Sequence, residues 1–585
     1  MSGDVPQQIQ ARRGFSIFYR GKTLLSNIDP VSQAERLADN LPMQERTLYV
    51  CLSPLYGYGL RRLLERMAAN APNSAALCIE ADEQLFRIAS ENIPAELKAG
   101  GRLQLSNLRE KAAVCEFVRQ SWGKRRFRRV KKVCLSGGWQ LFPNLYDSLI
   151  DALRREIALD WGNALVLAKL GRLYIRNALR NLALLSRYPS ITRLSFGNAP
   201  VLALGAGPSL DEVLDALERH FGKSLDKSSR CFRIICADTC LKALYARNIE
   251  PDLAVILESQ HWNLDDFTGL GAWRIPAALD LSALPASARL PNIQPYLFFT
   301  PWTELRLFRR LAAVGLLPAV FPPLGSVGLN AAAIALRVTG GPVLIGGMDF
   351  SFTVDAGHAR SSPAHLNRLA RHNRFSGPLN AAAFSGSQRL IGKNGKPVLS
   401  NSALRNYRDI FEQEFAANAR LFDINGGLPL GVPILSEAEY VSLLEKGGTA
   451  NPLPAQNGET QNTALNQQLI DFMQAEKDRL ITLKNILTGT AGESPEQPQT
   501  ENGLPLAKLE NLIDECDYLW AHFPDYAETG GRRPSAAELS AAAPQAISFL
   551  KRLRAEIESV LKILETEAFP KLTEFWKWLN WHFYT

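Results

Sequence analysis

The chain carries Leu202-Ala-Leu-Gly-Ala-Gly-Pro-Ser-Leu-Asp211, in which an apolar run breaks into Gly205, Gly207 and Pro208 before a helical pattern begins. This order is typical of a turn between a strand and a helix that binds a phosphate. Glycines let the backbone approach a ligand, Ser209 adds a hydroxyl, and the first amides of the helix are unpaired and can point at an anion. We therefore expect a nucleotide or a nucleotide sugar here.

Two further predicted strands end in acidic residues. The apolar run 232–237 is followed by Asp238 and Thr239, and the run 253–257 is followed by Glu258. Because the carboxyl ends of strands form the ligand crevice of an open α/β sheet, we expect these side chains to converge with the glycine turn. Each of them alone is equally well explained as a helix N-cap, a position that favours Asp, Ser and Thr.

A second turn with glycine and serine, Gly325-Ser326, precedes a predicted helix and supplies a second set of amide donors. The strand after it, 342–346, leads to Asp349, and the polar stretch that follows contains His358. A neutral imidazole at this place can accept a proton near neutral pH, so His358 is the candidate general base. The alternative is a surface histidine without a role.

Composition sets the class of protein. At about 100 to 200 residues per domain, 585 residues suggest about three or four domains. The net charge is +8, and part of it lies in the basic run 124–132, which we interpret as a solvated helix-to-strand edge, with an acidic partner or a membrane surface as alternatives. The eight scattered cysteines predict reduced thiols, and the histidines at 358, 365 and 372 lack the spacing of a metal site. With no signal peptide and no apolar run of about 18 residues, we expect a cytoplasmic protein with no integral membrane segment and no nucleic-acid partner.

The predicted architecture is α/β with a helical end. Residues 1–150 form a Rossmann-like N-terminal lobe, with strands predicted from the apolar runs 47–52, 75–79 and 133–136. Glu80 and Asp82 follow the second of these strands as a ribose-binding carboxylate would, although a structural lobe without a ligand is the alternative. Residues 151–195 are a helical connector, and 196–445 are the central α/β domain.

The last part of the chain, 446–585, is predicted to be a helical domain with polar linkers at 447–458 and 488–502. Its final stretch, 569–584, is crowded with aromatic residues. We interpret this stretch as a helix that buries Phe575, Trp576 and Leu579, with a docking face for a partner protein or a contact with a membrane as alternatives.

A set of motifs along residues 15–445 resembles the motility-associated factor (Maf) glycosyltransferases, which belong to the wider group typed by the archaeal 6-hydroxymethylpterin diphosphokinase MptE. The residues that carry the resemblance are Leu24-Leu-Ser-Asn-Ile-Asp-Pro30, Leu204-Gly-Ala-Gly-Pro-Ser-Leu-Asp211, Ala237-Asp238, Ile249-Glu-Pro-Asp252, Gly325-Ser-Val327, Gly346-Gly-Met-Asp-Phe350, His358-Ala359, Asp423-Ile-Asn-Gly-Gly427 and Gly431. The resemblance implies a central domain similar to bacterial sialyltransferases.

The resemblance also implies a reaction: transfer of a nonulosonic acid, such as pseudaminic or legionaminic acid, from its CMP-activated form to Ser or Thr of flagellin in the bacterial cytoplasm. His358 would then be the base and Asp349 would position the sugar or the histidine loop. The residues expected to bind the donor are Gly205, Gly207, Pro208, Ser209, Asp238, Thr239, Glu258, Gly325 and Ser326. The partners are flagellin and the CMP-sugar; a metal ion is not firmly implied, and the use of Mg²⁺ and a homo-oligomeric state stay open.

Two rival functions come from other classes. A diphosphokinase of the MptE type would use ATP and Mg²⁺, and Asp238, Glu258 and Asp349 could serve as its carboxylates. A non-catalytic flagellin-binding protein with a decayed nucleotide fold is the second rival.

Overall fold

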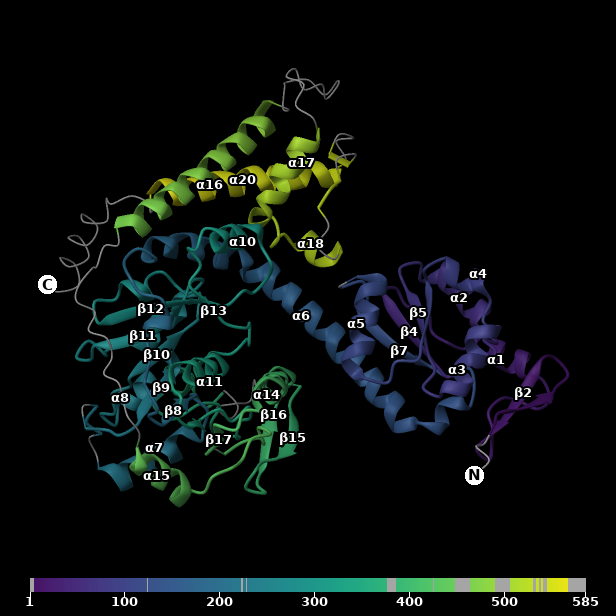
Figure 1. The fold of residues 1–585 in the computed structure, drawn as a ribbon, viewed down its shortest axis with the longest axis horizontal. Coiled ribbons are helices and arrows are strands. Elements are labelled where there is room, and N and C mark those ends of the chain that lie inside the picture. Colours follow the sequence, from purple (N-terminus) through teal and green to yellow (C-terminus); the bar gives the residue numbers. More distant parts are fainter. Residues whose placement is uncertain are drawn as a thin grey trace. The chain divides into compact units, whose positions relative to one another are not determined.

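The computed structural model describes residues 5–123, 125–222, 225–227, 229–375, 386–424, 426–447, 463–489, 506–529, 533–535, 538–539 and 544–566. The chain forms two compact units (Figure 1). The first comprises Met1–Gly171 and Ala521–Pro534, and the second comprises Arg172–Trp520 and Ser535–Thr585. All eight cysteines lie in the described residues, and none of them forms a disulfide.

The first unit contains a four-stranded parallel sheet, so the prediction of an α/β lobe here is confirmed. Its strands run in the order β6-β5-β4-β7 and are β4 Thr47–Leu52, β5 Ala75–Ile79, β6 Leu103–Ser106 and β7 Arg129–Val133. The helices around it are α1 Pro30–Asp39, α2 Leu60–Asn70, α3 Glu83–Asn92, α4 Ala95–Ala99 and α5 Lys111–Trp122. A small antiparallel sheet at the start of the chain is built from β1 Gln7–Gln10, β2 Phe15–Tyr19 and β3 Lys22–Thr23.

The basic run lies at a helix-to-strand edge, as predicted, but the strand begins earlier than expected. The apolar pattern placed it at 133–136, whereas β7 runs from Arg129 to Val133. Because β7 is an edge strand, only Val133 is fully buried and Arg129 and Lys131 face solvent. An edge strand that packs on one face needs few apolar residues, and this is why the pattern missed it.

The second unit is built on an eight-stranded sheet in the order β13-β12-β11-β10-β9-β8-β14-β17, and all neighbouring strands are parallel (Figure 1). The strands are β8 Val201–Leu204, β9 Arg233–Ala237, β10 Leu253–Ile256, β11 Ile275–Asp280, β12 Ile293–Phe299, β13 Ala319–Val320, β14 Val343–Gly346 and β17 Leu421–Asp423. Its helices are α7 Leu210–Phe221, α8 Leu241–Tyr245, α9 Leu264–Phe267, α10 Arg306–Ala313, α11 Val327–Val338, α12 Pro363–Arg371, α14 Ser402–Phe415 and α15 Glu437–Lys446. A hairpin of β15 Gln388–Ile391 and β16 Pro397–Ser400 follows α12.

The direction of the chain through this sheet reverses next to β8. The chain proceeds from β8 outward to β13 and then returns to the other side of β8 as β14. Helix α11 packs over β8, β9, β10 and β14, and its small buried residues Ala331, Ala332 and Ala335 allow the close approach. In an open α/β sheet, the point between strands such as β8 and β14 is where ligands bind.

The helical connector forms as one long helix, α6 Pro143–Asn181, which starts in the first unit and ends in the second. At its end, the Asn177 amide nitrogen donates to the carbonyls of Ser259 (2.9 Å) and Ser282 (3.2 Å). Asn181 donates in the same way to Leu281 (3.0 Å) and Ala283 (2.9 Å). These contacts fix the end of α6 on the loops that follow β10 and β11.

The predicted helical end of the chain is confirmed for its described part, which consists of α16 Thr463–Gly489, α17 Leu506–Glu515, α18 Pro524–Thr529 and α20 Pro544–Thr566. Within the second unit, Arg310 of α10 donates to both carboxylate oxygens of Glu476 in α16, at 2.6 and 2.9 Å. Residues 448–462, 490–505 and 567–585 lie outside the described part, and with them nearly all of both predicted linkers and the aromatic stretch with Phe575, Trp576 and Leu579.

Candidate functional site

The carboxyl edge of the eight-stranded sheet gathers the acidic residues singled out in the sequence. Asp238 follows β9, Glu258 follows β10 and Asp349 follows β14, while the glycine turn follows β8. Because all these strands are parallel, their ends lie along one edge, as expected. The roles of the individual residues stay predictions, but the structure shows which of their polar groups are already engaged.

The glycine turn is held by backbone contacts with the loop after β14. The Gly205 amide donates to the Gly346 carbonyl (2.8 Å), and the Gly207 amide donates to the Gly347 carbonyl (2.7 Å). A Cβ on Gly205 would lie 2.7 Å from the Gly347 oxygen, and Gly347 itself has φ +66°. The glycines therefore allow two strand-end loops to meet, and this packing requires them whether or not a ligand binds.

The expectation of unpaired amides at the start of α7 is wrong for Ser209. Its amide donates to the Asp349 carboxylate (2.8 Å), and its hydroxyl donates to the other oxygen of the same carboxylate. Asp349 is 4% exposed, and burial raises its pKa to about 6 against the opposing effect of the Ser209 hydrogen bonds. The N-terminus of α7, which Pro208 precedes, thus binds an anion that the protein itself supplies.

The second glycine-serine turn is the more open of the two. Ser326 is the N-cap of α11, and its side chain makes no capping hydrogen bond. Gly325 has φ +74°, and a Cβ there would lie 3.0 Å from the Tyr407 ring. The side-chain nitrogen of the fully buried Asn330 donates back to the Ser326 carbonyl (3.1 Å), while its oxygen finds no hydrogen-bond partner among the described residues. A ligand phosphate therefore has better access to the start of α11 than to the start of α7.

His358 lies beside the glycine turn, because the next residue, Ala359, donates its amide to the Ala206 carbonyl (2.9 Å). In the part of the chain that the structure describes, His358 Nδ1 is buried and makes no hydrogen bond. Burial, followed by the charges of Arg368 and His365, lowers the pKa of His358 to about 4. The imidazole is therefore neutral at pH 7 and has a free ring nitrogen at the point where the sheet reverses its order.

Asp238 is engaged in a buried polar network. Its two oxygens accept from the Thr239 amide (2.9 Å) and from the Asn263 side chain (2.7 Å), and Asn263 also reaches Asp266 (3.4 Å). Burial, and next the charge of Asp266, raise the pKa of Asp238. Asp238 thus links the end of β9 to the loop before α9, and a direct bond to a ribose would compete with these contacts.

Two further carboxylates lie at this edge: Asp280, which was missed in the sequence, and Asp423, which was quoted there only as part of a motif and not as a site residue. Asp280, at the end of β11, accepts from the amides and hydroxyls of Ser282 and Thr300, and Asp423, at the end of β17, pairs with the Lys393 ammonium group. Both hold strand-end loops in place. The sequence indicates Asp280 by the pair Asp280 and Ser282 at the end of an apolar run. Asp280 would have been identified as a residue at the end of a strand if β11 had been predicted.

Aromatic residues at the same edge were also missed. The rings of Tyr174 in α6 and Trp302 after β12 meet edge to face, with centroids 5.3 Å apart. Burial first, and then the acidic groups of Glu258, Tyr407 and Asp280, raise the pKa of Tyr174 to about 12. These residues come from elements far apart in the sequence, so no local pattern could bring them together.

The crevice of the N-terminal lobe is covered by the chain itself. Leu24 accepts a hydrogen bond from the Gly137 amide (2.7 Å) at the turn after β7, and Leu24 and Leu25 pack with Leu55 beyond β4. Glu80 is 1% exposed and accepts hydrogen bonds from the Ser53 hydroxyl (2.6 Å) and from Tyr146 (3.3 Å). The structure therefore favours a structural lobe over one that binds a dinucleotide.

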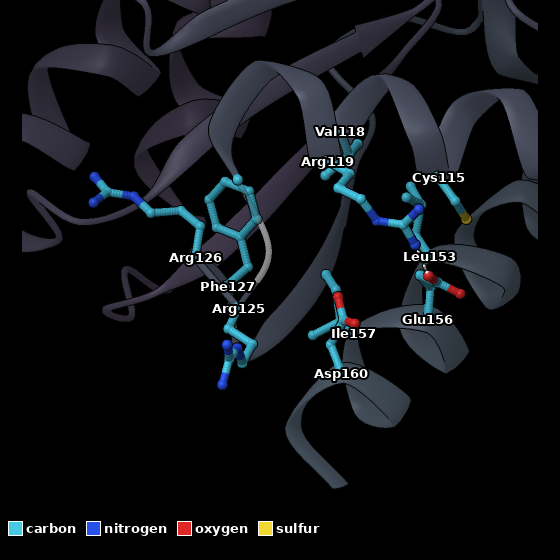
Figure 2. A pocket seen from close by; sticks show the side chains of 11 residues that line it. Cys115, Val118, Arg119, Arg125, Arg126, Phe127, Leu153, Glu156, Ile157 and Asp160 are labelled. Atoms are coloured by element: carbon cyan, nitrogen blue, oxygen red, sulfur yellow. Dashed lines mark hydrogen bonds and ion pairs between the residues drawn. The ribbon is translucent and has the colours of Figure 1, made fainter. Parts of the chain in front are cut away.

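A pocket beside the basic run is too small for a nucleotide. Figure 2 shows Arg119 paired with Glu156 on one side of it and Arg125, Arg126 and Phe127 on the other. Its volume of about 20 Å³ is enough for about one water molecule.

The described residues offer neither a cluster of metal ligands nor a membrane-spanning helix. They contain no group of three or more His, Cys, Asp and Glu side chains placed to hold a metal ion. No helix in them is both long enough and apolar enough to cross a lipid bilayer.

Comparison with known proteins agrees with the resemblance. Residues 176–355 match the family described as 6-hydroxymethylpterin diphosphokinase MptE-like. An uncharacterized protein of Treponema pallidum (strain Nichols) is 29% identical over 591 residues, which cover 96% of each chain. The solved structure of a MAf glycosyltransferase from Magnetospirillum magneticum AMB-1 superposes with a TM-score of 0.51 at 14% identity, over 96% of this chain and 91% of that one. The resemblance is thus confirmed: the fold is that of a MAf glycosyltransferase, with an MptE-like segment in its middle.

Proposed function

We propose that the protein is a cytoplasmic glycosyltransferase that moves a nonulosonic acid from a CMP-activated donor to Ser or Thr of flagellin. The fold shared with a MAf glycosyltransferase and the motifs found in the sequence support this proposal. The single observation that carries it is the neutral His358, whose Nδ1 has no partner among the described residues and which adjoins the turn after β8.

His358 acts as the general base in this proposal. Cleavage of the bond to CMP leaves positive charge on the sugar, and the acceptor hydroxyl must lose a proton as it attacks. His358 is neutral at pH 7 and can take this proton, although its low pKa makes it a weak base that accepts the proton late in the attack.

The donor phosphate lies at the start of α11 in this proposal. The unpaired amides of the first turn and the Ser326 hydroxyl stabilise the charge that develops on CMP as it leaves. Gly325 leaves room for the backbone to approach the phosphate. Asp349 does not contact the phosphate and instead holds the loop that leads to His358 in place through Ser209.

The experiment is the intact mass of flagellin co-expressed with this protein and with a pathway that makes a CMP-nonulosonic acid. We expect a gain of one sugar mass or a multiple of it, and no gain with His358→Ala. His365→Ala is the matched control, because His365 lies in the same region at the start of α12 and should leave the gain intact. An unmodified flagellin with the wild-type protein would contradict the proposal.

The name of the matching family keeps a second function in view, that of a diphosphokinase. Consumption of ATP with Mg²⁺ and 6-hydroxymethylpterin, without any change in flagellin mass, would favour it. Co-purification of unmodified flagellin without binding of a CMP-sugar would instead favour a flagellin-binding protein.

A further inference from the structure

An aromatic cluster lies at the carboxyl ends of β10 to β12. We define it by Tyr174, Trp302 and Tyr407, together with Glu258 and Ser259. Helix α6 supplies Tyr174, three residues before Asn177, and so on the same face of the helix. Because Asn177 bonds to the loops after β10 and β11, Tyr174 is held over the ends of these strands.

Trp302 is the central ring of the aromatic cluster. Its ring meets Tyr174 at 5.3 Å and is supported from behind by Phe299 at 5.7 Å and Phe308 at 5.1 Å. Its indole Nε1 is buried and makes no hydrogen bond within the described residues. A buried indole N–H normally has an acceptor, so this unpaired donor points to a partner that the described residues do not supply.

Ser259 adds a second unsatisfied group. It is 2% exposed, its carbonyl accepts from Asn177, and its hydroxyl has no partner in the described part of the chain. The neighbouring Glu258 uses one carboxylate oxygen to accept from the Gln260 amide (2.8 Å). The aromatic cluster thus has donors that lack acceptors next to a carboxylate that can accept more bonds.

Tyr407 links the aromatic cluster to the start of α11. Its ring packs on Gly325, where a Cβ would lie 3.0 Å from the ring. The charges of Glu258, Tyr407 and Asp280 each raise the pKa of Tyr174, so each of these groups acts electrostatically on the Tyr174 hydroxyl. A ligand bound at the α11 N-terminus would therefore extend toward both tyrosines.

We propose that the aromatic cluster binds the polyhydroxylated side of the donor's sugar ring, while the donor phosphate lies at the start of α11. Ring C–H groups pack on aromatic faces, and the sugar hydroxyls and N-acyl groups match the indole N–H, the serine and tyrosine hydroxyls and Glu258. The Glu258 carboxylate repels the phosphate and so orients the donor with its charged end toward α11. This inference rests on the proposed function and adds the residues that select the sugar.

The test compares the binding of CMP with the binding of CMP-pseudaminic and CMP-legionaminic acid by isothermal titration calorimetry. Tyr174→Phe and Tyr407→Phe remove one hydroxyl each and keep the rings. We expect both variants to bind CMP as the wild type does and to bind the preferred CMP-sugar about tenfold more weakly, as the loss of one hydrogen bond implies. Tyr245→Phe is the matched control, since Tyr245 lies in α8 and packs on Trp273.

Ser259→Ala separates a ligand contact from a structural role. Removal of a buried hydroxyl without a partner should leave the thermal midpoint unchanged or raise it, yet it should weaken binding of the CMP-sugar by several fold. If all three variants bind the CMP-sugar as tightly as the wild type, the inference is wrong while the proposed function stands. If the wild type binds neither CMP nor a CMP-sugar, the proposed function fails, and the inference fails with it.

Discussion

Substitution of Asp349 by Asn should stabilise the second unit at neutral pH. The carboxylate is 4% exposed, and its pKa is raised from the ordinary value of 3.8 to about 6 by burial. A carboxyl group whose pKa is raised by folding contributes stability below its unfolded pKa and loses it as pH rises through the folded pKa. Over this interval the ionised group costs about 3 kcal/mol, at about 1.4 kcal/mol for each pH unit.

Asparagine avoids this cost and can keep both hydrogen bonds. Its oxygen can accept from the Ser209 amide, and its nitrogen can donate to the Ser209 hydroxyl, because that hydroxyl can rotate. The variant should match the wild type near pH 4 and exceed it by up to about 3 kcal/mol at pH 8.

The assay is urea denaturation at pH 4.5, 6 and 8, combined with hydrogen exchange of β8 and α7, so that the second unit is followed apart from the first. Asp215→Asn is the control, since this exposed residue of α7 pairs with Arg247 at the surface and should change stability by less than about 1 kcal/mol. If Asp349→Asn gains no stability relative to the wild type as pH rises, the α7 N-terminus holds the charge without penalty and the reasoning is refuted. A gain in stability together with a loss of sugar transfer would show that the charge is kept for the reaction.

Three further predictions concern other parts of the molecule. Burial raises the pKa of Glu80 from 4.5 to about 7, so the free energy of unfolding of the wild-type first unit should fall by about 3 kcal/mol between pH 4.5 and 8, whereas that of Glu80→Gln should not. Urea denaturation at both pH values measures this, and an equal fall in the two proteins would contradict it. Glu476→Gln leaves Arg310 and Arg479 without their buried carboxylate, at a cost in stability of about 3 kcal/mol. Limited trypsin digestion should therefore release the C-terminal helices faster than in the wild type, and an unchanged rate would contradict this. Because the pKa of His358 is lowered to about 4, single-turnover transfer should stay constant from pH 8 to about 5 and fall only near pH 4, whereas a fall near pH 6.5 would assign the base to another group.

Continuous apolar runs were the reliable signal for the fold. Strands β4 and β5 were predicted at their observed bounds, because strands covered on both faces carry apolar residues throughout. Strands β11 and β12 were not predicted, although both are internal to the sheet. Each contains a proline, Pro276 and Pro295, and a proline inside an apolar run argues against a central strand.

The positions of the candidate site residues were predictable, but their partners were not. The order of strands places Asp238, Glu258 and Asp349 at one edge, and this follows from the alternation of strands and helices alone. Ser209 donates its hydrogen bonds to Asp349, which lies 140 residues further along the chain. No local sequence pattern indicates such a tertiary contact. The same holds for Tyr174, which the sequence showed only as one residue of a helical connector.

The two asparagines at the end of α6 determine where the central fold can be cut. Four loop carbonyls receive their hydrogen bonds from Asn177 and Asn181, so a shortened protein that began at β8 would leave all four without these donors. The segment that matches the MptE-like family starts at residue 176 and includes both asparagines. The last turns of α6 thus belong to the same folding unit as the sheet, and the connecting helix supplies the first residues of the central fold.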